Sequence, residues 1–119
     1  MADKKYNWIK IASSIDELHF EANGMCLMDV DGKKITLAKH NGALFAFAHK
    51  CPHASGIMAD GFIDAAANVA CPVHRYKFNM QTGRNTTGEG YYLKTYLVEQ
   101  RADGIYTGFE ERGLFSFLD

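Results

Sequence analysis

The sequence has 119 residues and a formal net charge of −1 at pH 7. This length suits one domain with a substantial core and excludes a separate catalytic domain beside it. No basic stripe accumulates along the chain, so we expect no nucleic-acid partner. No apolar run near the N-terminus is long enough to target or span a membrane, so we expect no membrane association and a cytoplasmic location.

The first part of the chain predicts short strands separated by tight turns. Residues 8–11 predict a strand, and residues 13–18 predict a capped turn rather than a long helix. Residues 25–30 and 34–39 flank Asp31-Gly32-Lys33, which is a strong signal for a hairpin.

The same kind of signal recurs further along the chain. Asn41-Gly42 joins the second strand of that hairpin to residues 44–47. Residues 91–100 alternate well enough to predict one long strand, which Asp103-Gly104 turns into another. Short strands with Asx-Gly turns at this density predict an all-β fold of antiparallel sheets, arranged as a sandwich or barrel.

Two short segments each offer one thiolate and one imidazole. They are Cys51-Pro52-His53 and Cys71-Pro72-Val73-His74, and each is tight enough for one loop tip to deliver two ligands. Residues 54–70 leave room for a strand, a turn and a return strand between the tips. Two cysteines and two histidines form the ligand set of a Rieske centre, a [2Fe–2S] cluster in which histidines replace cysteines on one iron. The pattern therefore predicts a carrier of single electrons.

Formal charges explain why this chemistry uses histidine. Two ferric ions, two sulfides and four thiolates sum to minus two, whereas two neutral imidazoles in place of two thiolates bring the oxidised sum to zero. An electron is therefore accepted more readily, in line with potentials of about −150 to +300 mV for Rieske centres and about −400 mV for plant-type ferredoxins.

A structural zinc ion is the alternative that these four residues leave open. Zinc sites usually pair like with like, with about two to four residues between cysteines and about three to five between histidines. The mixed spacing favours the cluster, and a zinc-stabilised interaction module remains the alternative from a different functional class.

The other histidines and the third cysteine carry no comparable signal. A ring-hydroxylating oxygenase commonly holds a mononuclear iron with two histidines and a carboxylate, and His19, His40 and His49 show no such grouping. The chain is therefore predicted to be a carrier or small subunit rather than an enzyme, with His49 near the ligands or at the surface. Cys26 lies in the apolar run 25–28, where we expect a buried, inert thiol.

The chain resembles Rieske-type ferredoxins, the small soluble electron carriers of bacterial aromatic-ring oxygenase systems. The resemblance is close over residues 51–54, 61–63 and 71–83 and looser from Trp8 to Phe109. It implies one [2Fe–2S] cluster per chain, with a flavin-dependent ferredoxin reductase and a terminal oxygenase as partners. It also implies that cysteines bind one iron and histidines the other, so the expected ligands are Cys51, Cys71, His53 and His74.

The resemblance also implies how the chain is divided. Residues 1–119 would form a single Rieske domain with a base of residues 1–45 and 85–119 and an inserted cluster-binding subdomain from about 46 to 84. Residues 76–79 would form a strand within the insert, closed by Gln81-Thr82-Gly83.

The same resemblance predicts a low reduction potential. High-potential members join the two cluster loops by a disulfide at the positions of Gly56 and Val73, which cannot form here. They also place hydroxyl donors where this chain has Tyr76 and Phe78, and such donors stabilise the reduced state. Phe78 cannot donate, so we expect a potential near the bottom of the Rieske range.

The loop that usually covers the cluster in this family is proline-rich, whereas residues 85–90 here contain no proline. The cover is therefore either looser or shaped differently, because glycine gives flexibility where proline gives stiffness. The small subunit of an assimilatory nitrite reductase is a further alternative. It shares the fold but often lacks the ligands, so the presence of all four disfavours it.

Several other residues receive predictions from their place near the motifs. We expect Met58 and Met80 to pack beneath the ligand loops, and Gly56 and Gly61 to let the first loop fold back. The apolar tail 114–118 is expected to pack on the base, with a subunit contact as the alternative. The cations beside the ligands form either a solvated rim or a docking patch for an acidic partner, and they are Lys50, Arg75 and Lys77.

Overall fold

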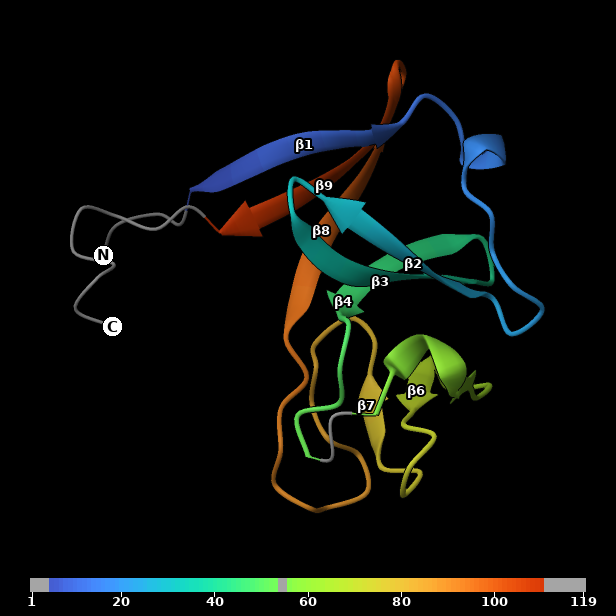
Figure 1. Ribbon diagram of the computed structural model, residues 1–119, viewed down its shortest axis with the longest axis vertical. Helices are drawn as coiled ribbons and strands as arrows, with labels where there is room; N and C mark the ends of the chain where they lie inside the picture. The colour runs from blue at the N-terminus through green and yellow to red at the C-terminus, as the bar shows by residue number, and fades with distance from the viewer. Residues whose placement is uncertain (1–4, 54–55, 111–119) are drawn as a thin grey trace.

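A computed structural model describes residues 5–53 and 56–110 of the protein. Nearly all of its regular structure is antiparallel β-sheet, as predicted (Figure 1). The strands are β1 (Tyr6–Ala12), β2 (Met25–Val30), β3 (Lys33–His40), β4 (Ala43–Ala48), β5 (Phe62–Ile63), β6 (Asn68–Ala70), β7 (Lys77–Asn79), β8 (Thr95–Arg101) and β9 (Gly104–Glu110), with two short 3₁₀ turns, η1 (Ile15–Glu17) and η2 (Met58–Asp60). The apolar segment 114–118 lies outside the described residues.

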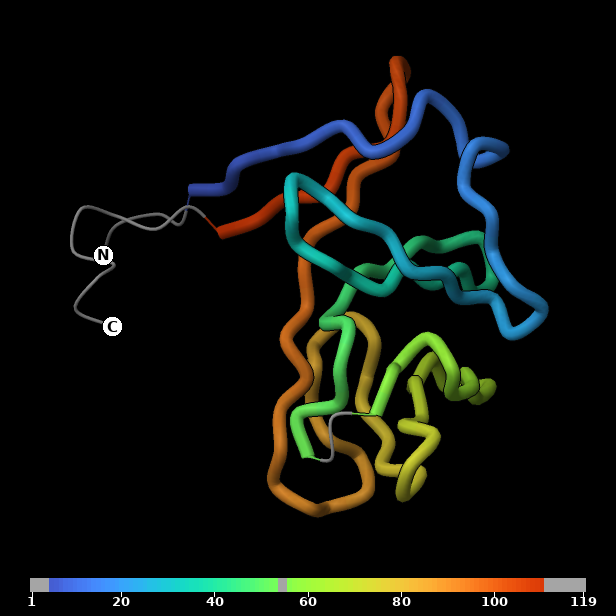
Figure 2. Tube along the Cα trace, viewed as in Figure 1, coloured from blue at the N-terminus to red at the C-terminus, as the bar shows by residue number. Residues whose placement is uncertain are grey.

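The strands form two sheets of different size. The larger has the order β1-β9-β8-β4-β3-β2 and curls into a half-barrel, whereas β5, β6 and β7 form the smaller sheet (Figure 1). Only two residue pairs join β4 to β8 within the larger sheet, Ala46 with Tyr96 and Phe47 with Thr95. The smaller sheet and the loops around it lie beyond this junction, at one end of the half-barrel (Figure 2).

Local sequence accounts for the hairpins of the larger sheet. Asp31 and Gly32 have φ of 54° and 85°, and Asn41 and Gly42 have φ of 50° and 81°. Two consecutive residues with positive φ characterise the tight turn whose twist matches that of the flanking strands, and Asx-Gly adopts it at low cost. Both predicted hairpins are confirmed, with Val30 paired to Lys33 and His40 paired to Ala43.

The predicted strand over residues 91–100 is wrong at its start, because β8 begins at Thr95. Leu93 donates its N–H to the carbonyl of Gly83 at 3.0 Å, and the carbonyl of Lys94 accepts from Ala48 at 2.9 Å. These contacts belong to a loop that joins the two sheets. The alternating sequence pattern therefore begins at residue 91, before the hydrogen-bonded strand begins at Thr95.

Buried side chains form two apolar clusters. One lies within the curled larger sheet and contains Ile35, Leu37 and Ile105. The other lies between the two sheets and contains Phe47, Phe78 and both cysteines of the paired motifs. In the described ranges, no helix is long and apolar enough to cross a membrane. The predicted boundaries of base and subdomain, and the cytoplasmic location, stay predictions.

Candidate metal centre

The first ligand loop connects β4 to η2 and closes on itself through its backbone. Cys51 donates its N–H to the carbonyl of Gly56 at 2.8 Å, and Met58 donates to the carbonyl of His49 at 3.0 Å. These bonds fold the chain back so that Cys51 and His53 stand in one tight loop.

The second ligand loop is the connection between β6 and β7. Cys71 donates its N–H to the carbonyl of Tyr76 at 2.9 Å, and Arg75 donates to the carbonyl of Cys71 at 2.8 Å. Arg75 takes a left-handed conformation with φ of 59°, which lets the chain reverse within these few residues. The reversal places Cys71 at the base of the loop and His74 at its tip.

The cysteines lie inside and the histidines outside. Cys51 and Cys71 are only 3% and 1% exposed, whereas His53 is half-buried and His74 is exposed. Burial raises the pKa of the Cys71 thiol, and so does the neighbouring Cys51 side chain, while the backbone N–H groups of Val73 and His74 oppose this by donating toward the sulfur. The two sulfurs are therefore neighbours, with peptide donors ready to stabilise a thiolate.

The two imidazoles also face each other. The Nδ1 atoms of His53 and His74 are 3.5 Å apart, and their ring centroids are separated by 5.1 Å. The structure therefore brings all four predicted ligands together as two pairs, one of sulfur and one of nitrogen.

This pairing discriminates between one metal ion and two. In the part of the chain that the structure describes, no three histidine, cysteine or acidic side chains converge so that they could hold a single ion. A structural zinc needs all four donors around one point, whereas a Rieske cluster needs two donors on each of two irons. The arrangement of the donors in two pairs fits the cluster.

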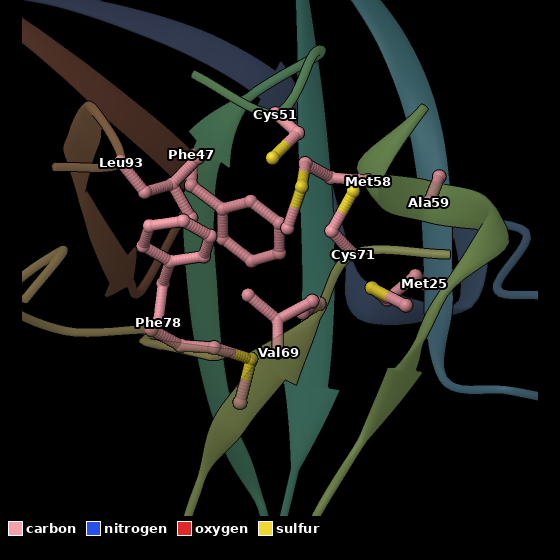
Figure 3. Close-up of a cluster of buried hydrophobic side chains, with 11 residues drawn as sticks. Met25, Phe47, Cys51, Met58, Ala59, Val69, Cys71, Phe78 and Leu93 are labelled. Atoms are coloured by element: carbon pink, nitrogen blue, oxygen red, sulfur yellow. The ribbon is translucent and has the colours of Figure 1, made fainter. Parts of the chain in front are cut away.

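An apolar floor lies beneath the donors. The side chains of Cys51 and Cys71 join a buried cluster with Phe47, Met58 and Phe78 (Figure 3). Met58 and Met80 are 0% and 1% exposed, which confirms that the methionines next to the ligand loops pack in the core. The floor keeps water from the sulfur side of the site and leaves the histidine side open.

Aromatic rings surround the imidazoles. The ring centroid of Tyr76 lies 4.4 Å from that of His53, and the ring centroid of Tyr91 lies 5.0 Å from it. Sequence reasoning missed Tyr91 as a site residue because its alternating neighbours predicted a strand. Gly88 and Gly90, which precede it with φ of 86° and 88°, are the sequence signal for the loop that delivers it.

Of the three cations predicted to lie beside the ligands, one is engaged elsewhere in an ion pair. Lys77 directs its Nζ to Asp64 at 3.1 Å, and Asp64 also accepts N–H bonds from Ala66 and Asn68. Burial alone would raise the pKa of Asp64, but the donors of Asn68, Lys77 and Ala66 outweigh it and hold the value at about 2. Lys77 thus belongs to the β5–β6 turn, whereas Lys50 and Arg75 are exposed beside the ligands.

Two other residues lie outside the donor set. Cys26 is half-buried rather than fully buried, and burial, with a smaller contribution from Glu21, raises the pKa of its thiol. The expected full burial of Cys26 is therefore wrong, while the raised pKa favours the protonated thiol. Buried Nδ1 of His49 has no hydrogen-bond partner among residues 5–53 and 56–110, and its ring joins no metal-binding group there.

Comparison with known proteins agrees with this geometry. The family described as Rieske [2Fe-2S] domain matches residues 7–96. The naphthalene 1,2-dioxygenase system ferredoxin component of Pseudomonas putida is 30% identical over 93 residues, which cover 77% of this chain and 86% of that protein.

Solved structures share the fold at lower identity. A putative NADH-dependent nitrite reductase small subunit from Mycobacterium tuberculosis has a TM-score of 0.77 at 16% identity, covering 91% of this chain and 99% of that one. A chain in the complex of reduced oxygenase and oxidized ferredoxin in carbazole 1,9a-dioxygenase has a TM-score of 0.72 at 19% identity, covering 89% of this chain and 96% of that one. The family match over residues 7–96 shows that this chain belongs to the Rieske [2Fe-2S] domain family.

Proposed function

We propose that this protein is a Rieske ferredoxin that carries single electrons from a flavin-dependent reductase to a terminal oxygenase. The observation that carries the proposal is the arrangement of the donors in two pairs, with buried cysteines and outward histidines. Cys51 and Cys71 would hold the inner iron, and His53 and His74 the outer iron. When bound, the cluster accepts and releases one electron at a time.

The residues around the donors suit this role. Peptide N–H groups near Cys71 stabilise thiolate charge, and the apolar floor with Phe47 and Phe78 excludes water from the sulfur side. Binding through the facing Nδ1 atoms leaves the other ring nitrogen of each histidine free for water or a docked protein. A partner at this surface would therefore be only an imidazole away from the outer iron.

An electron carrier of this kind catalyses no reaction on its own. The electron would enter and leave through the exposed histidine side of the site. Such a transfer makes and breaks no bond of a substrate bound to this chain. The protein would thus act as a component of a multi-protein oxygenase system rather than as an enzyme. The names of its relatives, including the ferredoxin component from Pseudomonas putida, support this assignment.

A small subunit of a nitrite reductase is the second candidate. The fold alone does not separate it from a ferredoxin, since a putative subunit of that kind has a TM-score of 0.77 to this chain. The presence of both cysteines and both histidines, already grouped in pairs, favours the electron carrier. The identity of the neighbouring genes distinguishes the two candidates independently of the fold.

The decisive experiment is electron paramagnetic resonance of the purified protein before and after dithionite, with iron, sulfide and zinc assayed on the same sample. We expect a rhombic signal only after reduction, with an average g below that of all-cysteine ferredoxins. A colourless, zinc-loaded protein that stays EPR-silent after anaerobic reconstitution with iron and sulfide would exclude the electron carrier.

Matched variants test the ligand set. Cys51→Ser, Cys71→Ser, His53→Ala and His74→Ala should each lose the rhombic signal or change its shape. Cys26→Ser and His40→Ala remove the same residue types at positions outside the donor set and should leave the signal unchanged. A rhombic signal of wild-type shape in any of the four ligand variants would remove that residue from the set.

A further inference from the structure

The loop over residues 85–90 is tied together by one side chain, that of Asn85. Its Nδ2 group donates to the carbonyl of Lys77 at 3.0 Å, to Thr87 Oγ1 at 3.1 Å and to Glu89 Oε1 at 2.9 Å. Its Oδ1 atom accepts from the backbone N–H of Glu89 and, at 2.9 Å, from that of Gly90. The amide therefore fixes a loop that proline does not stiffen.

Two threonines attach the same loop to β7. Thr86 donates its N–H to the carbonyl of Lys77 at 2.8 Å, and Thr87 Oγ1 accepts the N–H of Lys77 at 3.1 Å. Lys77 follows directly after Tyr76, whose ring packs on His53. The loop is thus anchored next to the second ligand loop, along the lower edge of the molecule in Figure 2.

This anchoring holds the carboxylate of Glu89 near the histidine side of the site. Thr87 Oγ1 and Asn85 Nδ2 both donate to Glu89 Oε1. The Thr87 hydroxyl and then the Asn85 amide lower the pKa of Glu89, so it is ionised at neutral pH. Two residues later the ring of Tyr91 lies 5.0 Å from that of His53, so the loop returns to the same imidazole.

We propose that Glu89 lowers the reduction potential of the metal centre through its fixed negative charge, and that Asn85 is the residue that positions it. The inference rests on the proposed role of His53 as a ligand. Reduction adds one electron and takes the formal charge of the two irons, two sulfides and two thiolates from zero to minus one. A carboxylate near the histidine side disfavours this added charge more than it disfavours the neutral, oxidised state.

The test is the midpoint potential of the cluster-loaded protein at pH 7, measured by protein-film voltammetry. Glu89→Gln should favour reduction by at least about threefold in the equilibrium constant, or about 30 mV at about 59 mV per decade for one electron. Glu89→Asp keeps the charge and should lie closer to wild type.

Glu99→Gln is the matched control, because Glu99 lies in β8 of the larger sheet and pairs with Arg101 at 2.9 Å. It removes the same charge from the protein at a site away from the loops, so its midpoint should stay at the wild-type value. A midpoint for Glu89→Gln that equals the midpoint for Glu99→Gln would overturn the proposed role of Glu89.

A double-mutant cycle tests the positioning by Asn85. If Asn85 holds Glu89 in place, Glu89→Gln should shift the midpoint less in an Asn85→Ala background than in wild type. Thr87→Val removes the other donor to Glu89 and gives a second background if Asn85→Ala fails to fold. Fully additive shifts would overturn the role of Asn85.

The EPR spectrum recorded before each voltammetric measurement separates this inference from the proposed function. A wild-type protein without the rhombic signal would overturn the ligand set itself. An intact signal with no specific effect of Glu89→Gln would overturn only the tuning by Glu89.

Discussion

Gly56 of the first ligand loop packs against Val73 of the second. A Cβ atom on Gly56 would lie 2.5 Å from Cγ2 of Val73, 3.6 Å from its Cβ and 3.0 Å from the sulfur of Cys71. Only glycine fits without displacing one of these groups. The two loops thus pack closely at the positions that a disulfide joins in the high-potential branch of the family.

This geometry predicts that Gly56→Cys/Val73→Cys will form a disulfide. The Cβ separation of 3.6 Å falls within the range of about 3.5–4.5 Å found in disulfides, and replacing Val73 removes the methyl group that blocks position 56. Closing a loop of this size should stabilise the fold by about 3 kcal/mol in the chain-entropy account. Thiol titration and thermal unfolding with and without reductant measure it.

The single variants provide the control for the disulfide. Gly56→Cys alone keeps the clash with Val73 and should destabilise the first loop, while Val73→Cys alone should be close to neutral because Val73 is 48% exposed. A double variant with the same stability in both redox states would contradict the predicted bridge.

Substitution of Gly61 by alanine should cause a large loss in the free energy of unfolding. A Cβ at this position would lie 1.8 Å from the backbone oxygen of Ala70, in the neighbouring strand β6. Gly61→Ala must therefore push the segment around residue 61 away from β6. We expect a loss of about 3 kcal/mol in the free energy of unfolding, the upper end for overpacking. Urea denaturation followed by circular dichroism measures it.

Gly88 offers a comparison with strain but without a clash. It has φ of 86°, and apart from its two chain neighbours no described residue has an atom within 4 Å of the position that a Cβ would occupy. Gly88→Ala should therefore cost only the left-handed conformation, about 1 kcal/mol. Equal losses for Gly61→Ala and Gly88→Ala would mean that the β6 contact is not the reason for glycine at position 61.

The reduction potential is predicted to lie near −150 mV, at the bottom of the Rieske range of about −150 to +300 mV. Phe78 is fully buried in the apolar floor and offers no hydroxyl, while the ring of Tyr76 packs on that of His53 at an interplanar angle of 33°. Hydrogen bonds to charged acceptors contribute about 1.5–3 kcal/mol, only part of it specific to the reduced state, so the missing donors lower the potential by about 100 mV. A midpoint well above zero at neutral pH would contradict this.

Lys50 and Arg75 are predicted to speed docking of an acidic reductase. Both are exposed beside the ligand loops and, unlike Lys77, are not paired with Asp64. Lys50→Glu/Arg75→Glu should slow reduction by the partner about tenfold or more at low salt and much less at high salt, because salt screens steering. Stopped-flow spectroscopy at several ionic strengths measures the rate.

The matched control reverses two exposed lysines of β3, Lys34 and Lys39, which changes the net charge equally at another surface. It should change the rate little. An equal effect of both double variants would show that overall charge, not the site beside the ligands, governs association.

The local sequence determined the parts of this protein that depend on neighbouring residues. Asp31-Gly32 and Asn41-Gly42 encode their turns because positive φ at two successive residues is a local requirement. Each Cys/His motif indicates a metal site because its two ligand types stand at short spacing within a single loop. The all-β fold class was therefore predictable, and the local motifs were enough to propose the four ligands.

Tertiary structure decided which distant residues meet these motifs. Strand β8 begins at Thr95 rather than at the predicted residue 91. The ring of Tyr91 packs near that of His53, and Lys77 pairs with Asp64. Tertiary structure also completed the hydrogen bonds of Asn85, which hold Glu89 in the loop that brings Tyr91 to His53. The contacts of Tyr91 and Lys77 join segments that are distant in the sequence, so no local pattern encodes them. The bonds of Asn85 to Thr87, Glu89 and Gly90 are local, and its bond to the carbonyl of Lys77 is the one that needs β7 beside the loop.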